Sequence, residues 1–190
     1  LADRNTSSNP KDKKLNLLVL GGSQGSTQLN EIVIESLYKI QNKNTWKVLH
    51  QTGEDDLNRL ENKYRDLGIE FEVKTFIKDM AKAYQNSDLV ISRAGAMTIA
   101  EISMMKKPSI LLPLPWAIDN HQFYNAQLLK KNGAAEVLES SNNSITSLTS
   151  FLEKLALNKE HLEMMSKSCS KISLPHSSKE ILRIIDEYFK

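Results

Sequence analysis

Short apolar runs recur along this chain, and each is followed by a stretch whose apolar residues have helical spacing. The runs lie at residues 15–20, 46–50, 71–76, 88–91, 109–112 and 135–138. The helical stretches lie at residues 27–41, 55–67, 80–85, 99–106, 121–132 and from 146 onward. Strands that alternate with helices form parallel sheets with right-handed crossovers. The pattern therefore predicts an α/β fold with a doubly wound parallel sheet.

Composition limits the function as well as the fold. The 190 residues are 40% hydrophobic, which suffices for a sizeable core. With 25 basic and 23 acidic residues, no charged patch favours a nucleic-acid partner. The single cysteine, Cys169, excludes an internal disulfide and fits a reducing compartment. No apolar run approaches the ~18 residues that span a bilayer, so we expect this piece of chain to be soluble.

The chain divides into three segments. Residues 1–14 are polar and predict a linker or tail, and residues 15–174 predict one α/β domain. After Pro175, residues 175–190 predict an amphipathic helix with a broad apolar stripe. Because the chain begins with Leu1 rather than Met, we expect it to be part of a longer protein.

Two turns of small residues, 21–25 and 92–98, each connect a predicted strand to a helix. Such a turn aims free backbone N–H groups and a positive dipole end at an anion, so a phosphate-bearing ligand is favoured. The alternative is an ordinary tight connection packed closely by glycine. The first turn is not the dinucleotide fingerprint, because the glycine spacing differs and the second strand ends in His50 and Gln51 without a carboxylate.

In parallel sheets, ligands bind beyond the carboxyl ends of the strands. This rule predicts one functional edge, formed by the Ser23 loop, His50 with Gln51, Ile77, the 96–98 turn and the 115–122 loop.

Two polar clusters at this edge have competing interpretations. Thr98 and Glu101 have the spacing of a capping box, which spacing alone favours. If the helix begins nearer Ala96, Glu101 faces the edge, where its carboxylate suits ribose hydroxyls. Residues 119–122 also have two interpretations. Asp119 fits the N-cap of a helix with Gln122 at its N3 position, and alternatively the four polar residues together suit sugar hydroxyls. No metal-ligand spacing and no nucleophile–base pair is visible in the sequence.

Five motifs stand in an order that resembles a known family. They are Gly21-Gly22-Ser23-Gln24-Gly25, His50-Gln51-Thr52-Gly53, Phe76-Ile77-Lys78-Asp79-Met80, Ser92-Arg93-Ala94-Gly95-Ala96-Met97-Thr98 and Asp119-Asn120-His121-Gln122. The chain resembles the C-terminal, donor-binding half of the MurG family, the bacterial UDP-N-acetylglucosamine transferases of glycosyltransferase family 28. The resemblance runs from about residue 15 to residue 139, with a compatible helical tail. It implies a Rossmann-like domain, one half of a two-domain GT-B enzyme.

The resemblance also implies how the diphosphate and ribose of UDP are held. Ser23 would contact the phosphates. Ala96, Met97 and Thr98 would hold the diphosphate at a helix start. Glu101 would accept hydrogen bonds from the ribose hydroxyls, which reverses the preference that spacing alone gives.

By the same resemblance, the Ile77 backbone would bind the uracil edge, and His121 and Gln122 would lie near the sugar. At position 121 the chain departs from family members that carry two glutamines, since it has His121 followed by Gln122. The resemblance assigns no catalytic residue to this half, and it implies neither a metal nor another cofactor.

The implied reaction is inverting transfer of N-acetylglucosamine from UDP-N-acetylglucosamine to the C4 hydroxyl of lipid I, which gives lipid II in peptidoglycan synthesis. Helix N-termini would stabilise the departing UDP without a metal. Lipid I would bind the missing N-terminal half, so this fragment alone would be inactive. The whole enzyme would be peripheral at the cytoplasmic face of the bacterial inner membrane.

Two alternatives and one structural expectation accompany this hypothesis. One alternative is the donor-binding subunit of a two-protein transferase, and the other is a non-catalytic nucleotide-binding module. In two-domain relatives the final helix packs on the N-terminal domain. Without that surface, we expect self-association through residues 175–190 or disorder beyond about Pro175.

Overall fold

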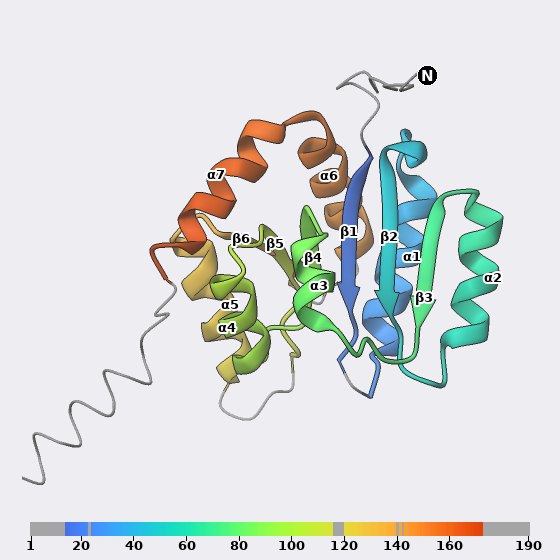
Figure 1. The fold of residues 1–190 in the computed structure, drawn as a ribbon, viewed down its shortest axis with the longest axis horizontal. Coiled ribbons are helices and arrows are strands. Elements are labelled where there is room, and N and C mark those ends of the chain that lie inside the picture. The colour runs from blue at the N-terminus through green and yellow to red at the C-terminus, as the bar shows by residue number, and fades with distance from the viewer. Residues whose placement is uncertain (1–13, 23, 116–119, 140, 142, 173–190) are drawn as a thin grey trace, which may run out of the picture.

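The computed structural model describes residues 14–22, 24–115, 120–139, 141 and 143–172 (Figure 1). Apart from Lys14, the predicted N-terminal tail lies outside the described residues, and so does the predicted helix 175–190. The self-association expected of that helix therefore remains a prediction.

Six parallel strands form one sheet in the order β3-β2-β1-β4-β5-β6. The strands are β1 (Leu15–Leu20), β2 (Trp46–Gln51), β3 (Glu70–Lys74), β4 (Leu89–Ser92), β5 (Ser109–Leu111) and β6 (Ala135–Val137). The chain builds one half outward from β1 and then crosses over to build the other half from β4. This order confirms the doubly wound, Rossmann-like prediction.

Helices cover both faces of the sheet (Figure 1). They are α1 (Thr27–Lys39), α2 (Leu57–Leu67), α3 (Met80–Gln85), α4 (Ala96–Met104), α5 (His121–Lys131), α6 (Ser144–Leu157) and α7 (Lys159–Cys169), with a short 3-10 helix, η2, at Lys43–Thr45. Alternating side chains of β1 divide the core between the faces. Leu17 and Val19 pack with α1, α2 and α6, while Leu18 and Leu20 pack with α3, α4 and α5. Burial on both faces explains why the central strands are continuous apolar runs.

The carboxyl ends of the central strands are level with one another. Leu20 of β1 is opposite Gln51 of β2 on one side and Ser92 of β4 on the other. The three connections that follow these residues therefore lie side by side, at the lower edge of the sheet in Figure 1.

Most element boundaries differ from the sequence prediction by one to three residues, and three of these differences are informative. Helix α4 begins at Ala96 rather than Ile99, because Gly95 in an extended conformation serves as its N-cap without a side chain. Strand β3 ends at Lys74 rather than Phe76, whose side chain is 56% exposed. The helical region after β6 begins at Ser144 and divides at Asn158, whose side chain accepts a hydrogen bond from the His161 N–H at 3.0 Å and so caps α7.

Candidate functional site

Arg93 joins the two turns that the sequence analysis singled out. It follows β4 directly, and its Nη2 donates to Ser26 Oγ and Gln28 Oε1, both at 3.0 Å. Its Nη1 donates to the Leu112 carbonyl at 3.2 Å. The guanidinium therefore lies between the start of α1 and the connection that leaves β5.

The charge of Arg93 has no carboxylate partner among the described residues, and its buried Nε has no hydrogen-bond partner there. Burial lowers its pKa, but arginine remains protonated at neutral pH. An unneutralised cation between two turns favours an anionic ligand. No role for Arg93 was predicted from the sequence, although an arginine in a small-residue turn after a buried strand was a usable signal.

Helix α4 presents free backbone amides at the same edge. Its first internal hydrogen bond runs from Ile99 N to Gly95 O at 3.0 Å, and no side chain caps the helix. The N–H groups of Ala96, Met97 and Thr98 consequently have no partner within the described part of the chain. Met97 is 77% exposed, so this first turn is open to solvent. Free amides at an open helix N-terminus suit a phosphate.

Glu101 does not form the capping box that its spacing favours. Helix α4 begins at Ala96, so Glu101 lies beyond its first turn, and the Glu101 Oε2 accepts a hydrogen bond from the Tyr84 hydroxyl of α3 at 3.0 Å. The capping-box prediction is wrong because Gly95, not Thr98, occupies the N-cap. The Glu101 carboxylate is half-buried. The pKa of Tyr84 is raised, mainly because the Tyr84 hydroxyl is buried and also because the negative charge of Glu101 lies next to it. Tyr84 therefore stays a neutral hydrogen-bond donor.

Ile77 follows β3 with its side chain buried. Its N–H donates to the side-chain oxygen of Gln51, Oε1, at 2.9 Å, while the Gln51 Nε2 donates to the Gly22 carbonyl at 2.8 Å. The described residues include no donor to the Ile77 carbonyl. The contact through Gln51 was not visible in the sequence, because the three residues are far apart in the chain.

Helix α5 is held against this edge by two amide side chains. Asn125 Nδ2 donates to the Ala94 carbonyl at 3.0 Å, and Gln122 Oε1 accepts from the Leu114 N–H at 3.0 Å. The N-cap residue of α5 is Asn120, so the predicted cap of Asp119 with Gln122 at N3 is wrong; Asp119 itself lies outside the described residues. His121 is exposed in the first turn of α5.

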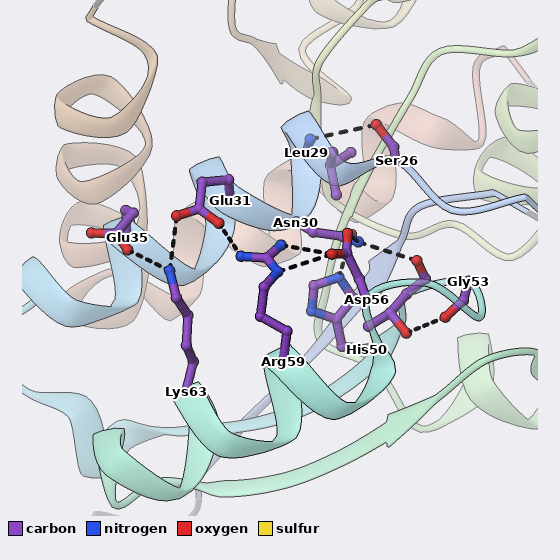
Figure 2. Close-up of polar contacts among 11 residues, drawn as sticks. Ser26, Leu29, Asn30, Glu31, Glu35, His50, Gly53, Asp56, Arg59 and Lys63 are labelled. Carbon is purple, nitrogen blue, oxygen red and sulfur yellow. Dashed lines mark hydrogen bonds and ion pairs between the residues drawn. The ribbon is translucent and has the colours of Figure 1, made fainter.

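His50 corrects a further prediction. It was expected along the functional edge, whereas its side chain is fully buried beneath that edge (Figure 2). Its Nδ1 lies 2.9 Å from the Tyr64 hydroxyl, and its Nε2 lies 3.0 Å from Asn30 Oδ1. Because Asn30 presents an oxygen to it, Nε2 carries the proton of the neutral ring and Nδ1 accepts from Tyr64. Burial lowers the pKa of His50 to about 3, although Asp56 acts in the opposite direction.

The same buried network supports the glycine turn. Asn30 Nδ2 donates to the Thr52 carbonyl at 3.1 Å and to Asp56 Oδ2 at 2.8 Å. Figure 2 shows the network continuing from Asp56 through Arg59, Glu31 and Lys63 to Glu35. A Cβ at Gly25 would lie 2.3 Å from the Thr52 carbonyl oxygen, so the turn rests directly on the backbone that Asn30 holds.

Of the predicted site residues, Ser23 lies outside the described residues. The structure brings the other seven to one edge: Ile77, Ala96, Met97, Thr98, Glu101, His121 and Gln122. Within the part of the chain that the structure describes, no group of three or more His, Cys, Asp or Glu residues is arranged to hold a metal ion. In that same part, every helix is too short or too polar to cross a membrane.

Comparison with known proteins identifies relatives that match most of the chain. The model of the glycosyltransferase family 28 C-terminal domain matches residues 16–181. A Coxiella burnetii protein named UDP-N-acetylglucosamine–N-acetylmuramyl-(pentapeptide) pyrophosphoryl-undecaprenol N-acetylglucosamine transferase is 35% identical over 92% of this chain and 49% of its own length. A protein of the same name from Anaeromyxobacter sp. is 39% identical over 93% of this chain and 47% of its own. The chain thus spans about half the length of these relatives.

Solved structures show the same relationship. The crystal structure of Acinetobacter baumannii MurG superposes with a TM-score of 0.86 at 31% identity, and covers 95% of this chain and 54% of that one. UDP-N-acetylglucosamine 2-epimerase from Neisseria meningitidis superposes with a TM-score of 0.60 at 13% identity, over 93% of this chain and 45% of that one, which shows a shared fold alone.

Proposed function

The chain belongs to the family of glycosyltransferase family 28 C-terminal domains, and we propose that it is the donor-binding half of a transferase that uses UDP-N-acetylglucosamine. The observation that carries this proposal is the open first turn of α4, with three backbone amides that have no partner among the described residues and with Arg93 in the turn that leads into the helix. Relatives over the same residues are named as N-acetylglucosamine transferases, which supports the choice of donor.

The diphosphate of the donor binds where positive potential is concentrated. The amides of Ala96, Met97 and Thr98 donate to its oxygens, and Arg93, which bonds to the start of α1, supplies a positive charge. Ser23 contacts the phosphates from the glycine turn. When the bond to the sugar breaks, negative charge grows on the departing UDP, and fixed amides with a helix dipole stabilise it without reorganising. No metal takes part in this scheme.

The nucleoside and the sugar bind on either side of the diphosphate. The Glu101 carboxylate, with one oxygen held by Tyr84, accepts hydrogen bonds from the ribose hydroxyls with the other. The Ile77 carbonyl accepts from the uracil N3–H. His121 and Gln122 lie near the sugar, and the bond between Gln122 and Leu114 supports this by fixing the α5 start.

The complete reaction needs the other half of the enzyme. Lipid I binds there, and its muramyl C4 hydroxyl attacks the sugar with inversion to give lipid II, a step of peptidoglycan synthesis. The chain described here binds the donor and transfers nothing alone. The whole enzyme works as a peripheral protein at the cytoplasmic face of the bacterial inner membrane, where its lipid substrate lies.

Isothermal titration calorimetry of this chain tests donor specificity directly. We expect UDP to bind much more tightly than UMP, which lacks one phosphate, and than ADP, which lacks the uracil. Equal affinities for UDP and ADP would contradict base recognition. Equal binding of NAD and UDP would instead support a general nucleotide-binding module.

A further inference from the structure

Gln51 connects two parts of the functional edge that are distant in sequence. It is the last residue of β2 and is 5% exposed. Its backbone carbonyl accepts from Gly21 N at 3.0 Å, and its side chain donates to the Gly22 carbonyl at 2.8 Å. The other end of the same amide accepts from the Ile77 N–H at 2.9 Å. One residue thus holds two consecutive positions of the glycine turn and the segment after β3.

The bond to Ile77 determines what that segment offers a base. Because its N–H is already paired, Ile77 presents only its carbonyl, which accepts hydrogen bonds and cannot donate them. Uracil carries a donor at N3, whereas cytosine carries an acceptor there. A buried site built for one hydrogen bond discriminates strongly against an analogue that leaves it unpaired.

We propose that Gln51 is a positioning residue that couples base selection to the glycine turn: its amide aligns the Ile77 backbone for uracil while it holds the turn that faces the diphosphate. This inference rests on the proposed function, because it assumes that Ile77 meets the base and the glycine turn meets the phosphates. It predicts that loss of the amide removes preference among bases and weakens binding of any nucleoside diphosphate.

Two substitutions distinguish the hydrogen bond that the Gln51 side chain donates from the one that it accepts. Gln51→Met keeps the length of the side chain and removes both hydrogen bonds. Gln51→Glu keeps an oxygen for the Ile77 N–H but cannot donate to the Gly22 carbonyl. Asn16→Ala serves as the control, because Asn16 Nδ2 pairs with Asp88 Oδ2 at 3.1 Å at the opposite end of the same sheet.

The measurement is the ratio of the dissociation constants of CDP and UDP, obtained by calorimetry on the full chain. We expect Gln51→Met to lower this ratio by about tenfold, the effect of one net hydrogen bond, and to weaken both ligands. Gln51→Glu should keep the ratio and weaken both ligands. Asn16→Ala should change neither. A folded Gln51→Met variant with the wild-type ratio would overturn the inference and leave the proposed function intact.

Amide hydrogen exchange gives a second test that needs no variant. The Ile77 N–H should be protected in the free wild-type chain before any nucleotide is added, since Gln51 already holds it. Rapid exchange at Ile77 would overturn the inference even if Gln51→Met does not fold. If the wild-type chain binds no UDP at all, the proposed function fails instead, and the inference falls with it.

Discussion

Glu101 shows how a single residue's role depends on where its helix begins. Spacing favours a capping box with Thr98, but the N-cap at Gly95 turns the carboxylate toward Tyr84 on α3. No pattern in the sequence predicts this contact, because Tyr84 and Glu101 come together only when α3 and α4 are in their folded positions. The resemblance to family 28 enzymes predicted a ligand-binding role for Glu101, and among the described residues no hydrogen bond occupies its other carboxylate oxygen.

Replacing Glu101 by Gln tests that role. The amide keeps an oxygen for the Tyr84 hydroxyl but loses the charge that strengthens bonds from ribose hydroxyls. We expect UDP affinity to fall by about tenfold or more, with little change in affinity for pyrophosphate, which has no ribose. The melting temperature should remain nearly unchanged, because no cap is lost.

Glu72→Gln, on the edge strand β3, is the matched control and should leave UDP binding unaffected. If Glu101→Gln lowers the free energy of unfolding by about 1 kcal/mol and spares UDP affinity, the carboxylate has a structural role alone.

The glycine turn and the β2–α2 connection are in direct backbone contact. Gly53 has a φ of +79°, and a Cβ there would lie 2.7 Å from Gly25 Cα and 2.8 Å from the Gln24 carbonyl oxygen. Gly53→Ala therefore introduces both strain from the left-handed conformation and a clash that pushes the turn outward. We expect a loss of stability of about 2 kcal/mol or more, with weaker binding of UDP and of pyrophosphate.

Gly68→Ala separates the two causes. Gly68 has a φ of +69° at the end of α2, and a Cβ there would meet nothing within 4 Å. This variant should lose about 1 kcal/mol from strain alone and bind UDP normally. Similar losses in the two variants, measured by chemical denaturation, would show that the contact between the turns is unimportant.

Helices and strands could be predicted where their burial produces a pattern of apolar residues in the sequence. The central strands appear as apolar runs because both faces are covered, and Gly68 marks the end of α2 by its conformation. Spacing alone favoured a later start for α4 than the alternative near Ala96, because Gly95 caps the helix without a side-chain bond. The contacts of Arg93, Gln51 and Asn125 could not be predicted for another reason: their hydrogen bonds connect segments that only the folded sheet brings together.

At the scale of the whole molecule, the buried network around His50 makes folding depend on pH. The ring is neutral in the folded chain, where burial lowers its pKa from 6.5 to about 3. In the unfolded chain it takes up a proton as the pH falls through its ordinary value. The unfolded state then binds more protons than the folded state, so stability must decrease between those two pKa values as the solution is acidified.

The expected size follows from this difference. Between about pH 7.5 and about pH 5.5, the free energy of unfolding should fall by about 1.4 kcal/mol on account of His50. Denaturant titrations at the two pH values measure it. His50→Gln will be less stable at both, because it disturbs the bonds to Asn30 and Tyr64, but its stability should lose this dependence on pH. His161→Gln leaves His50 in place and should keep the wild-type dependence. An unchanged dependence in His50→Gln would show that the buried ring does not govern acid sensitivity.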